Sequence, residues 1–146
     1  MSRIPPWPRW LGVAGLLPQW TLLFVLAVGG DYWRFAALAL AWGYAALIFS
    51  FLGGMWWGLA ARGVERVDGW VWIAAVLPSL IALATYTPWV FGAEWPGPSL
   101  IVLGIAILLT PLVDRKLRPL APDWWMSLRW PLSVGLGIAT LLCGVV

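Results

Sequence analysis

The segment FAALALAWGYAALIFSFLGGMWWGLAA, residues 35–61, contains 27 consecutive residues without a charged side chain. As an α-helix it would be about 40 Å long, because each helical residue advances the chain by about 1.5 Å. The hydrocarbon core of a bilayer is about 30 Å thick, so this segment is more than long enough to cross it. We therefore predict a transmembrane helix that tilts, extends beyond the membrane surface, or breaks at Gly53-Gly54.

Four further apolar stretches flank this segment, and together they occupy nearly all of the 146-residue sequence. Hydrophobic residues make up 62% of the chain and charged residues only 10%, whereas soluble domains carry about 25% charged residues. The sequence therefore predicts an all-α fold, a single membrane domain over residues 1–146 that forms an integral bundle of five transmembrane helices. The expected spans are about 10–28, 33–57, 70–88, 98–113 and 124–145.

The basic residues are distributed unevenly between the two sides of these spans. Only Arg34 falls on one side, and eight of the nine Lys and Arg residues fall on the other. Basic residues favour the cytoplasmic ends of membrane helices. We therefore expect a multi-pass protein of the cell inner (cytoplasmic) membrane, with its N-terminus in the cytoplasm and its C-terminus outside. The eight residues are Arg3, Arg9, Arg62, Arg66, Arg115, Lys116, Arg118 and Arg129.

The chain is also rich in tryptophan, with 14 residues. Tryptophan prefers the headgroup region, because its ring is apolar while its N–H requires a polar partner. We therefore expect most of these side chains to anchor the helices in the lipid. Those placed near the inner surface are Trp7, Trp10, Trp56, Trp57, Trp70, Trp72, Trp124, Trp125 and Trp130, and those near the outer surface are Trp33, Trp89 and Trp95.

The residue types that are missing argue against several functions. The chain has no histidine, and Cys143 is its only cysteine. The commonest general base and the commonest metal ligands are therefore absent, and we expect neither an enzyme, nor a metal site, nor a cofactor. The orientation rule explains the basic residues, so we expect no nucleic-acid partner. The first apolar run exceeds a typical signal-peptide core, and we expect it to be retained.

Small side chains recur every four residues along the second span, at Ala46, Ser50, Gly54 and Gly58. On a helix they would form one continuous strip that lets another helix approach closely, and Gly53 lies beside it. The strip suits packing inside the bundle. It also suits an interface with a partner membrane protein or a second copy of the chain, or a hinge at Gly53-Gly54.

Prolines Pro18, Pro78, Pro111 and Pro131 fall within predicted spans, and we expect each to kink its helix. Two of them are followed by a polar residue at similar membrane depth. These polar side chains are expected to satisfy the freed backbone carbonyls or, alternatively, to line a small cavity for a lipophilic ligand or substrate. The residues of this candidate pocket are Gln19, Trp20, Trp42, Tyr44 and Ser79.

One basic residue, Arg129, lies inside the fifth predicted span. A charged side chain within the membrane is a candidate for function. A long side chain near a helix end also extends to the headgroups, or pairs with an acidic residue such as Asp114 or Asp123. Asp114 itself is interpreted as part of the polar sequence that ends the fourth span.

Five segments of the chain carry a recognisable pattern: YAALIFSFLGGMWWG at 44–58, GVAGLLP at 12–18, LPSL at 77–80, PDWW at 122–125 and LR at 128–129. Together they resemble a known family of small multi-pass membrane proteins, the transmembrane-protein-sixty-nine-like family, also named domain of unknown function 3429. The resemblance implies about five transmembrane helices and supplies no activity or catalytic residue. The position before Trp57 is often basic or histidine in that family, and here it is Trp56.

Taken together, these patterns favour a non-enzymatic accessory, scaffold or assembly subunit that packs against membrane partners within the lipid bilayer. This hypothesis rests on the small-residue strip and on the short polar segments between the spans. The alternative is a binder or small transporter of a lipophilic ligand at the pocket around Gln19 and Trp42.

Overall fold

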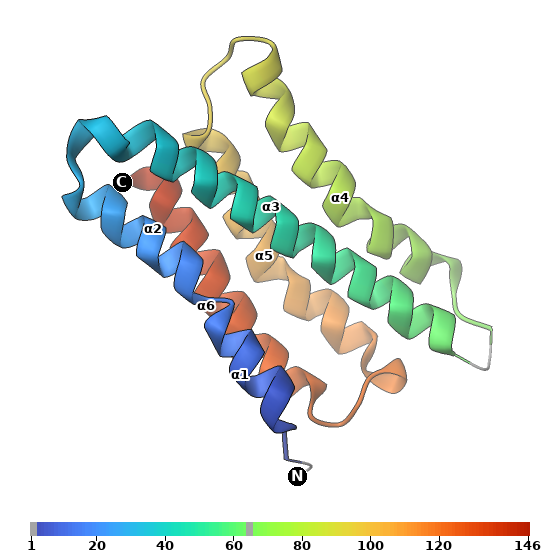
Figure 1. Ribbon diagram of the computed structural model, residues 1–146. Coiled ribbons are helices and arrows are strands. Elements are labelled where there is room, and N and C mark those ends of the chain that lie inside the picture. Colours follow the sequence, from blue (N-terminus) through green and yellow to red (C-terminus); the bar gives the residue numbers. More distant parts are fainter. Residues whose placement is uncertain (1–2, 64–65) are drawn as a thin grey trace.

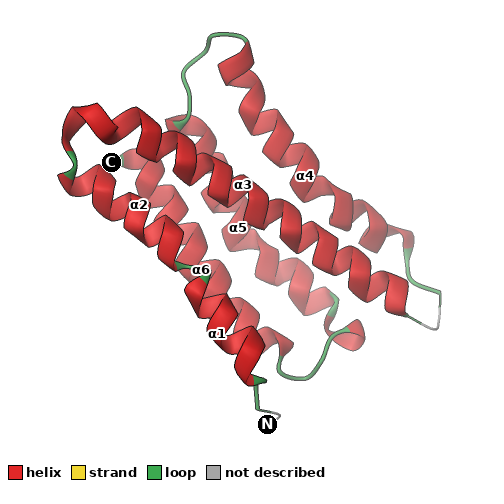
Figure 2. Ribbon diagram, in the orientation of Figure 1, coloured by secondary structure: helices red, strands yellow, loops and turns green. Residues whose placement is uncertain are grey.

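The computed structural model describes residues 3–63 and 66–146, which form a helical bundle without a strand in those ranges (Figures 1 and 2). Each apolar segment becomes a helix because hydrocarbon offers no partner for backbone N–H and C=O groups, which a helix satisfies internally. The helices are α1 (Pro6–Ala14), α2 (Leu17–Val28), α3 (Gly30–Arg62), α4 (Gly69–Val90), α5 (Gly97–Lys116) and α6 (Trp125–Val145), and a short 3-10 helix, η1 (Arg118–Leu120), follows α5.

Five helical segments in the described part of the chain are long and apolar enough to cross a membrane, which confirms the predicted fold class. Consecutive segments run in opposite directions (Figure 1). The N-terminal end, the α3–α4 connection and the α5–α6 connection lie at one end of the bundle. The α2–α3 turn, the α4–α5 loop and the C-terminal end lie at the other. The segments that carry the basic residues therefore gather at one end, as the sequence predicted.

The longest helix, α3, is continuous over 33 residues and does not break at Gly53-Gly54. It begins and ends outside the predicted range of 33–57. Its length is about 50 Å, so it exceeds the thickness of the hydrocarbon core. The alternative of a helix break or hinge at the two glycines is therefore wrong for this structure. Gly53 instead lies against the backbone of Ala75 on α4, where a Cβ atom would collide with the Ala75 carbonyl oxygen.

The first span is divided into α1 and α2 by a break at Gly15-Leu16, just before Pro18. The Tyr44 hydroxyl of α3 donates a hydrogen bond to the Gly15 carbonyl over 2.5 Å. This contact satisfies a backbone acceptor that the break releases. Pro78, Pro111 and Pro131 differ, because their helices continue through them.

Helices α5 and α6 pack closely along their length, and glycine makes this approach feasible. A Cβ atom on Gly104 would lie 2.6 Å from Leu141 Cγ, and one on Gly137 would lie 2.6 Å from Leu108 Cγ. Small residues at helix contacts are typical of membrane bundles, because packing rather than water exclusion drives association there. The central cluster also includes Phe49 of α3, Leu103 and Ile107 of α5, and Leu136 of α6.

Candidate functional site

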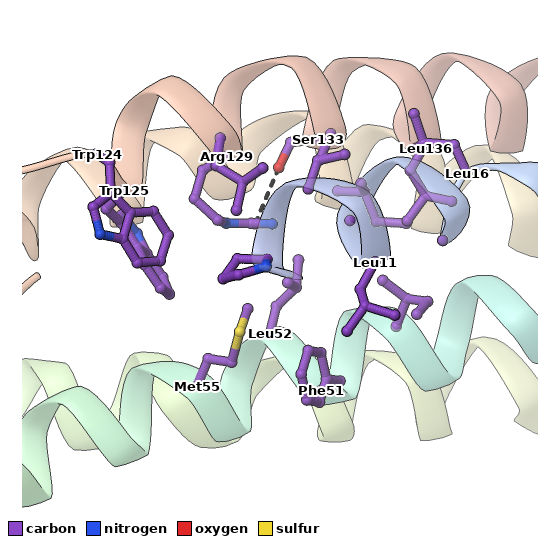
Figure 3. A pocket seen from close by; sticks show the side chains of 17 residues that line it. Leu11, Leu16, Phe51, Leu52, Met55, Trp124, Trp125, Arg129, Ser133 and Leu136 are labelled. Atoms are coloured by element: carbon purple, nitrogen blue, oxygen red, sulfur yellow. Dashed lines mark hydrogen bonds between the residues drawn. The ribbon is translucent and has the colours of Figure 1, made fainter. Parts of the chain in front are cut away.

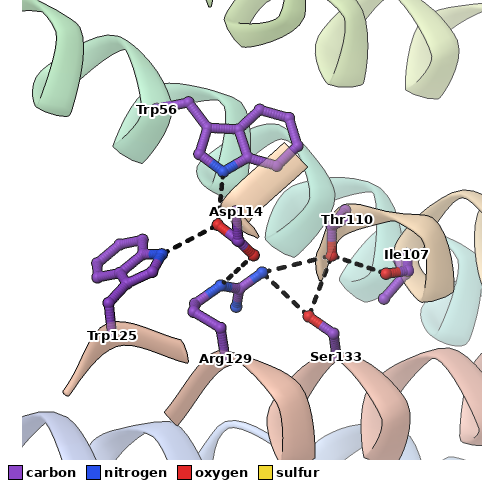
Figure 4. A network of polar contacts seen from close by, with 7 residues as sticks. All are labelled: Trp56, Ile107, Thr110, Asp114, Trp125, Arg129 and Ser133. Carbon is purple, nitrogen blue, oxygen red and sulfur yellow. Dashed lines mark hydrogen bonds and ion pairs between the residues drawn. The ribbon is translucent and has the colours of Figure 1, made fainter. Parts of the chain in front are cut away.

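A carboxylate lies completely buried at the centre of one end of the bundle. Asp114, in the last turn of α5, has no exposed surface. Its Oδ1 accepts hydrogen bonds from the indole N–H groups of Trp56 (2.8 Å) and Trp125 (3.1 Å). Its Oδ2 accepts a hydrogen bond from Arg129 Nε over 2.9 Å, which also makes this contact an ion pair (Figure 4). Three helices, α3, α5 and α6, thus meet at one carboxylate.

The Arg129 guanidinium extends the network along α5 and α6. Its Nη2 donates to Ser133 Oγ over 3.0 Å and lies 3.4 Å from Thr110 Oγ1. The two hydroxyls lie 3.0 Å apart, and Thr110 also donates to the Ile107 carbonyl. Arg129 Nη1 makes no hydrogen bond to the described residues, and in Figure 4 it points away from Asp114.

Helical spacing brings these polar side chains together. Thr110 and Asp114 lie four residues apart on α5, and Arg129 and Ser133 lie four residues apart on α6. Residues at this spacing share one face of a helix. The short connection through η1 turns the chain so that these two faces meet. Trp56 joins from the buried face of α3, which also carries Leu52 and Ala60.

The chemistry of this arrangement is that of a compensated charge pair. Removing a carboxylate and a guanidinium from water is costly, and the cost is offset only when the charges pair and their remaining polar atoms find partners. Asp114 meets that condition through three donors. Because both of its oxygens are engaged, it is held as a structural acceptor rather than offered as a base. Arg129 keeps one nitrogen, Nη1, without a hydrogen-bond partner among residues 3–63 and 66–146.

An apolar cleft of about 420 Å³ adjoins Arg129, between α1, α3 and α6 (Figure 3). It exists because α1 packs on α6, where Gly12 lies against Leu132, while the break at Gly15-Leu16 changes the course of the chain. Arg129 and Ser133 are the polar side chains in a lining that is otherwise apolar or aromatic. The residues that form most of the wall are Leu11, Leu16, Phe51, Leu52, Met55, Trp124, Trp125, Leu128, Leu132 and Leu136.

The pairing of Arg129 with Asp114, which the sequence suggested as one alternative, is present. Asp114 lies in the last turn of α5, in agreement with its place in the polar sequence that ends the fourth span, and it is also fully buried in the core of the site. Trp56 and Trp125 are buried as well, so they bind a carboxylate instead of anchoring the protein in lipid. The four-residue spacing of Trp125, Arg129 and Ser133 is the signal that could have identified Trp125, and it gives no information on Trp56 of α3.

The five residues of the predicted midplane pocket do not form one cavity. Gln19 is buried and donates to Thr140 Oγ1 over 3.0 Å, while its Oε1 has no partner among the described residues. Trp42 donates to Thr85 over 3.0 Å, and Tyr44 bonds to Gly15. Trp20 and Ser79 face outward. The structure therefore does not bring these five side chains together, because successive residues such as Gln19 and Trp20 project from different sides of one helix.

The predicted small-residue strip is divided between the inside and the outside of the bundle. Ala46 is buried and Ser50 is partly buried, whereas Gly54 and Gly58 are exposed. A Cβ atom added to either exposed glycine would meet nothing within 4 Å. Packing inside the bundle therefore does not explain Gly54 and Gly58, and Gly53 takes that role instead.

Neither the network nor the cleft presents a ligand set for a metal. Within residues 3–63 and 66–146, no three Cys, Asp or Glu side chains come close enough to hold a metal ion. Arginine carries only donors, and the two oxygens of Asp114 are already occupied. A cofactor in the cleft would be held by contacts with its apolar wall and by a hydrogen bond from Arg129 Nη1.

Comparison with known proteins agrees with the architecture. A family model described as "Protein of unknown function (DUF3429)" matches residues 4–145. Transmembrane protein 69 of Xenopus tropicalis is 31% identical over 128 residues, which cover 86% of this chain and 48% of that protein. The chain thus spans about half the length of the curated relative that it matches. No solved structure matches the chain significantly.

Proposed function

The chain belongs to the DUF3429 family of membrane proteins of unknown function, and we propose that it acts as a non-enzymatic accessory or assembly subunit that packs against a partner membrane protein. The observation that carries this proposal is the open glycine face of α3. Gly54 and Gly58 lie one turn apart, and neither backbone is covered by another part of the described chain. The connections between the helices are short, so the helix faces provide most of the surface available to a partner.

The occupant that best fits this face is a transmembrane helix of the partner. Two exposed glycines at a four-residue spacing allow a second helix backbone to approach closely, which strengthens dispersion contacts and interhelical hydrogen bonds in lipid. Leu47 and Phe51 are 71% and 61% exposed on the same helix and would pack around the incoming helix. A bulky side chain at either glycine would remove the close approach.

A non-enzymatic role is supported by the state of the buried polar groups. Asp114 is occupied by Trp56, Trp125 and Arg129, and the chain has no histidine to act as a general base. The charged network is therefore suited to holding α3, α5 and α6 together. Catalysis would need a free acid, base or nucleophile beside a substrate site.

The inner membrane of the cell is the proposed location, with the N-terminus in the cytoplasm. The support is the concentration of basic residues in the segments at one end of the bundle, because such residues favour the cytoplasmic surface. A soluble partner would then meet the protein at its basic end, whereas a membrane partner would use α3.

Docking through α3 is tested by purification in a gentle detergent followed by mass measurement of the intact complex. The wild-type chain is expected to retain a membrane-protein partner, and the variant Gly54→Leu/Gly58→Leu is expected to lose it. Ala84→Leu is the matched control, because Ala84 is an exposed small residue on α4. A monomer under every condition contradicts the proposal. A homodimer lost only in the glycine variant would identify a second copy as the partner.

A second candidate function is the binding or transport of a lipophilic ligand. The specific observation that favours it is the apolar cleft beside Arg129, which replaces the predicted pocket around Gln19 and Trp42. Clefts of about 300–1,000 Å³ with an apolar lining and few polar groups are typical of small-molecule sites.

A further inference from the structure

We propose that the cleft between α1, α3 and α6 binds a lipid that carries an uncharged carbonyl, with the carbonyl oxygen accepting a hydrogen bond from Arg129 Nη1 and the apolar tail lying along the cleft. This inference rests on the second candidate function and specifies the class of ligand. It does not depend on docking through the α3 glycines.

The first support is the unused capacity of the arginine. A guanidinium has five N–H groups. Nε bonds to Asp114, and Nη2 bonds to Ser133 and approaches Thr110, which leaves the N–H groups of Nη1 without a partner in the described chain. Nη1 also retains some exposed surface. The side chain is 7% exposed and lines the cleft.

The second support is the nature of the cleft wall. Leu11 of α1, Phe51 and Met55 of α3, and Leu132 of α6 line a space of about 420 Å³ (Figure 3). Such a wall offers dispersion contacts to an alkyl or isoprenoid tail and no hydrogen bond. Methionine is flexible and adapts to tails of different shape. The combination of an apolar channel and the unpartnered N–H groups of Arg129 Nη1 fits an amphipathic molecule with an acceptor near that nitrogen.

The third support is the charge of the site. Asp114 and Arg129 together carry no net charge, and the cleft is lined by no second cation. A carboxylate or phosphate on the ligand would leave an uncompensated negative charge in an apolar environment, which is strongly unfavourable. An uncharged carbonyl accepts the same hydrogen bond without that cost. Two sources have this chemistry: the ester carbonyl of a glycerolipid and the ketone carbonyl of a quinone.

The test is competitive photolabelling of the full chain in vesicles of a diether phosphatidylcholine, which lacks ester carbonyls. The probe is a monoacylglycerol with a diazirine in its tail, and labelled sites are mapped by mass spectrometry of peptides. The competitors are monoolein, an alkyl benzoquinone, ionised oleate and octadecene. We expect labelling within residues 48–55 and 124–136, and competition by monoolein or the quinone at a concentration about tenfold lower than octadecene requires.

Each outcome bears on a different part of the inference. Preferential competition by monoolein supports an ester lipid, and preferential competition by the quinone supports a ketone. Equal competition by octadecene overturns the role of the carbonyl and leaves lipid binding intact. Stronger competition by oleate than by monoolein or the quinone overturns the requirement for an uncharged headgroup. Labelling that no competitor reduces overturns ligand binding itself, and with it the second candidate function.

Two variants separate the cleft from the donor. Met55→Trp fills the cleft and is expected to abolish competed labelling, whereas Leu83→Trp on the exposed face of α4 is expected to leave it unchanged. Arg129→Lys keeps a cation beside Asp114 and removes Nη1. It is expected to make monoolein and octadecene equally effective, and a retained preference would contradict the assignment of Nη1. Thermal unfolding of each variant verifies that the bundle is intact, and Met55→Trp provides the test if Arg129→Lys does not fold.

Discussion

The carboxylate of Asp114 and the guanidinium of Arg129 lie 2.9 Å apart inside the bundle, one near the end of α5 and the other near the start of α6. The ion pair therefore joins the two helices next to the connection that reverses the chain. Trp56 adds α3 to the same carboxylate. The buried carboxylate is tolerated here because donors from α3 and α6 satisfy both of its oxygens.

Removing one member of the pair should destabilise the protein far more than removing both. Asp114→Leu or Arg129→Met alone leaves a buried charge without its partner, and we expect a loss of about 3–5 kcal/mol in the free energy of unfolding. The double variant should lose much less than the sum of the two. Denaturant titration in bicelles measures all four proteins. Additive losses would show that the two charges do not stabilise each other.

The indole N–H groups of Trp56 and Trp125 should each contribute to stability through Asp114. Phenylalanine retains most of the ring contacts and removes the donor, so Trp56→Phe and Trp125→Phe should each cost about 1.5–3 kcal/mol, as expected for a hydrogen bond to a charged group. Trp130→Phe is the control, because Trp130 is 55% exposed on α6. The same unfolding measurement applies, and equal losses for all three variants would contradict the role of the indoles.

The adjacent glycines of α3 should respond in opposite directions to the same substitution. Gly53→Ala places a methyl group against the Ala75 carbonyl, so α3 and α4 must separate at an expected cost of about 1–3 kcal/mol. Gly54→Ala meets open space and should be neutral or stabilising by up to about 1 kcal/mol, because alanine favours the helix. Melting temperatures of the two variants in one detergent compare them directly. A stable Gly53→Ala protein would mean that the two helices are less closely packed than described.

The proposed orientation predicts which ends of the bundle are accessible from the cytoplasm. A fluorescent protein fused at the N-terminus should fold and emit light, and alkaline phosphatase fused after Val146 should be active outside. This follows because eight of the nine basic residues fall at the end that includes the N-terminus and the α3–α4 and α5–α6 connections. Insertion of phosphatase between α5 and α6 should give no activity. Activity there, with an inactive fusion at Val146, would reverse the orientation.

The sequence predicted most of the architecture, because span length and apolar composition depend on the chain alone. It predicted five helical segments, although α3 extends beyond the predicted range of 33–57 and the first segment is divided into α1 and α2, and it also suggested Asp114 as a partner of Arg129. It did not predict which polar side chains lie together. Gln19 and Ser79 were grouped by membrane depth, yet depth does not fix the direction in which a side chain projects. Gln19 faces α6 and bonds to Thr140, and Ser79 faces outward.

The same difference separates Gly53 from Gly54. The two positions carry the same residue at nearly the same membrane depth. Successive residues of a helix point in directions about 100° apart, so Gly53 lies against α4 whereas Gly54 is open. The sequence by itself determined that the chain crosses a membrane with its basic segments at one end. The reason is that the free energy of transfer from water to lipid is a property of each residue type and does not depend on packing. Only the tertiary structure decided which faces meet, because helix rotation and packing bring Asp114 of α5, Arg129 of α6 and Trp56 of α3 to one place.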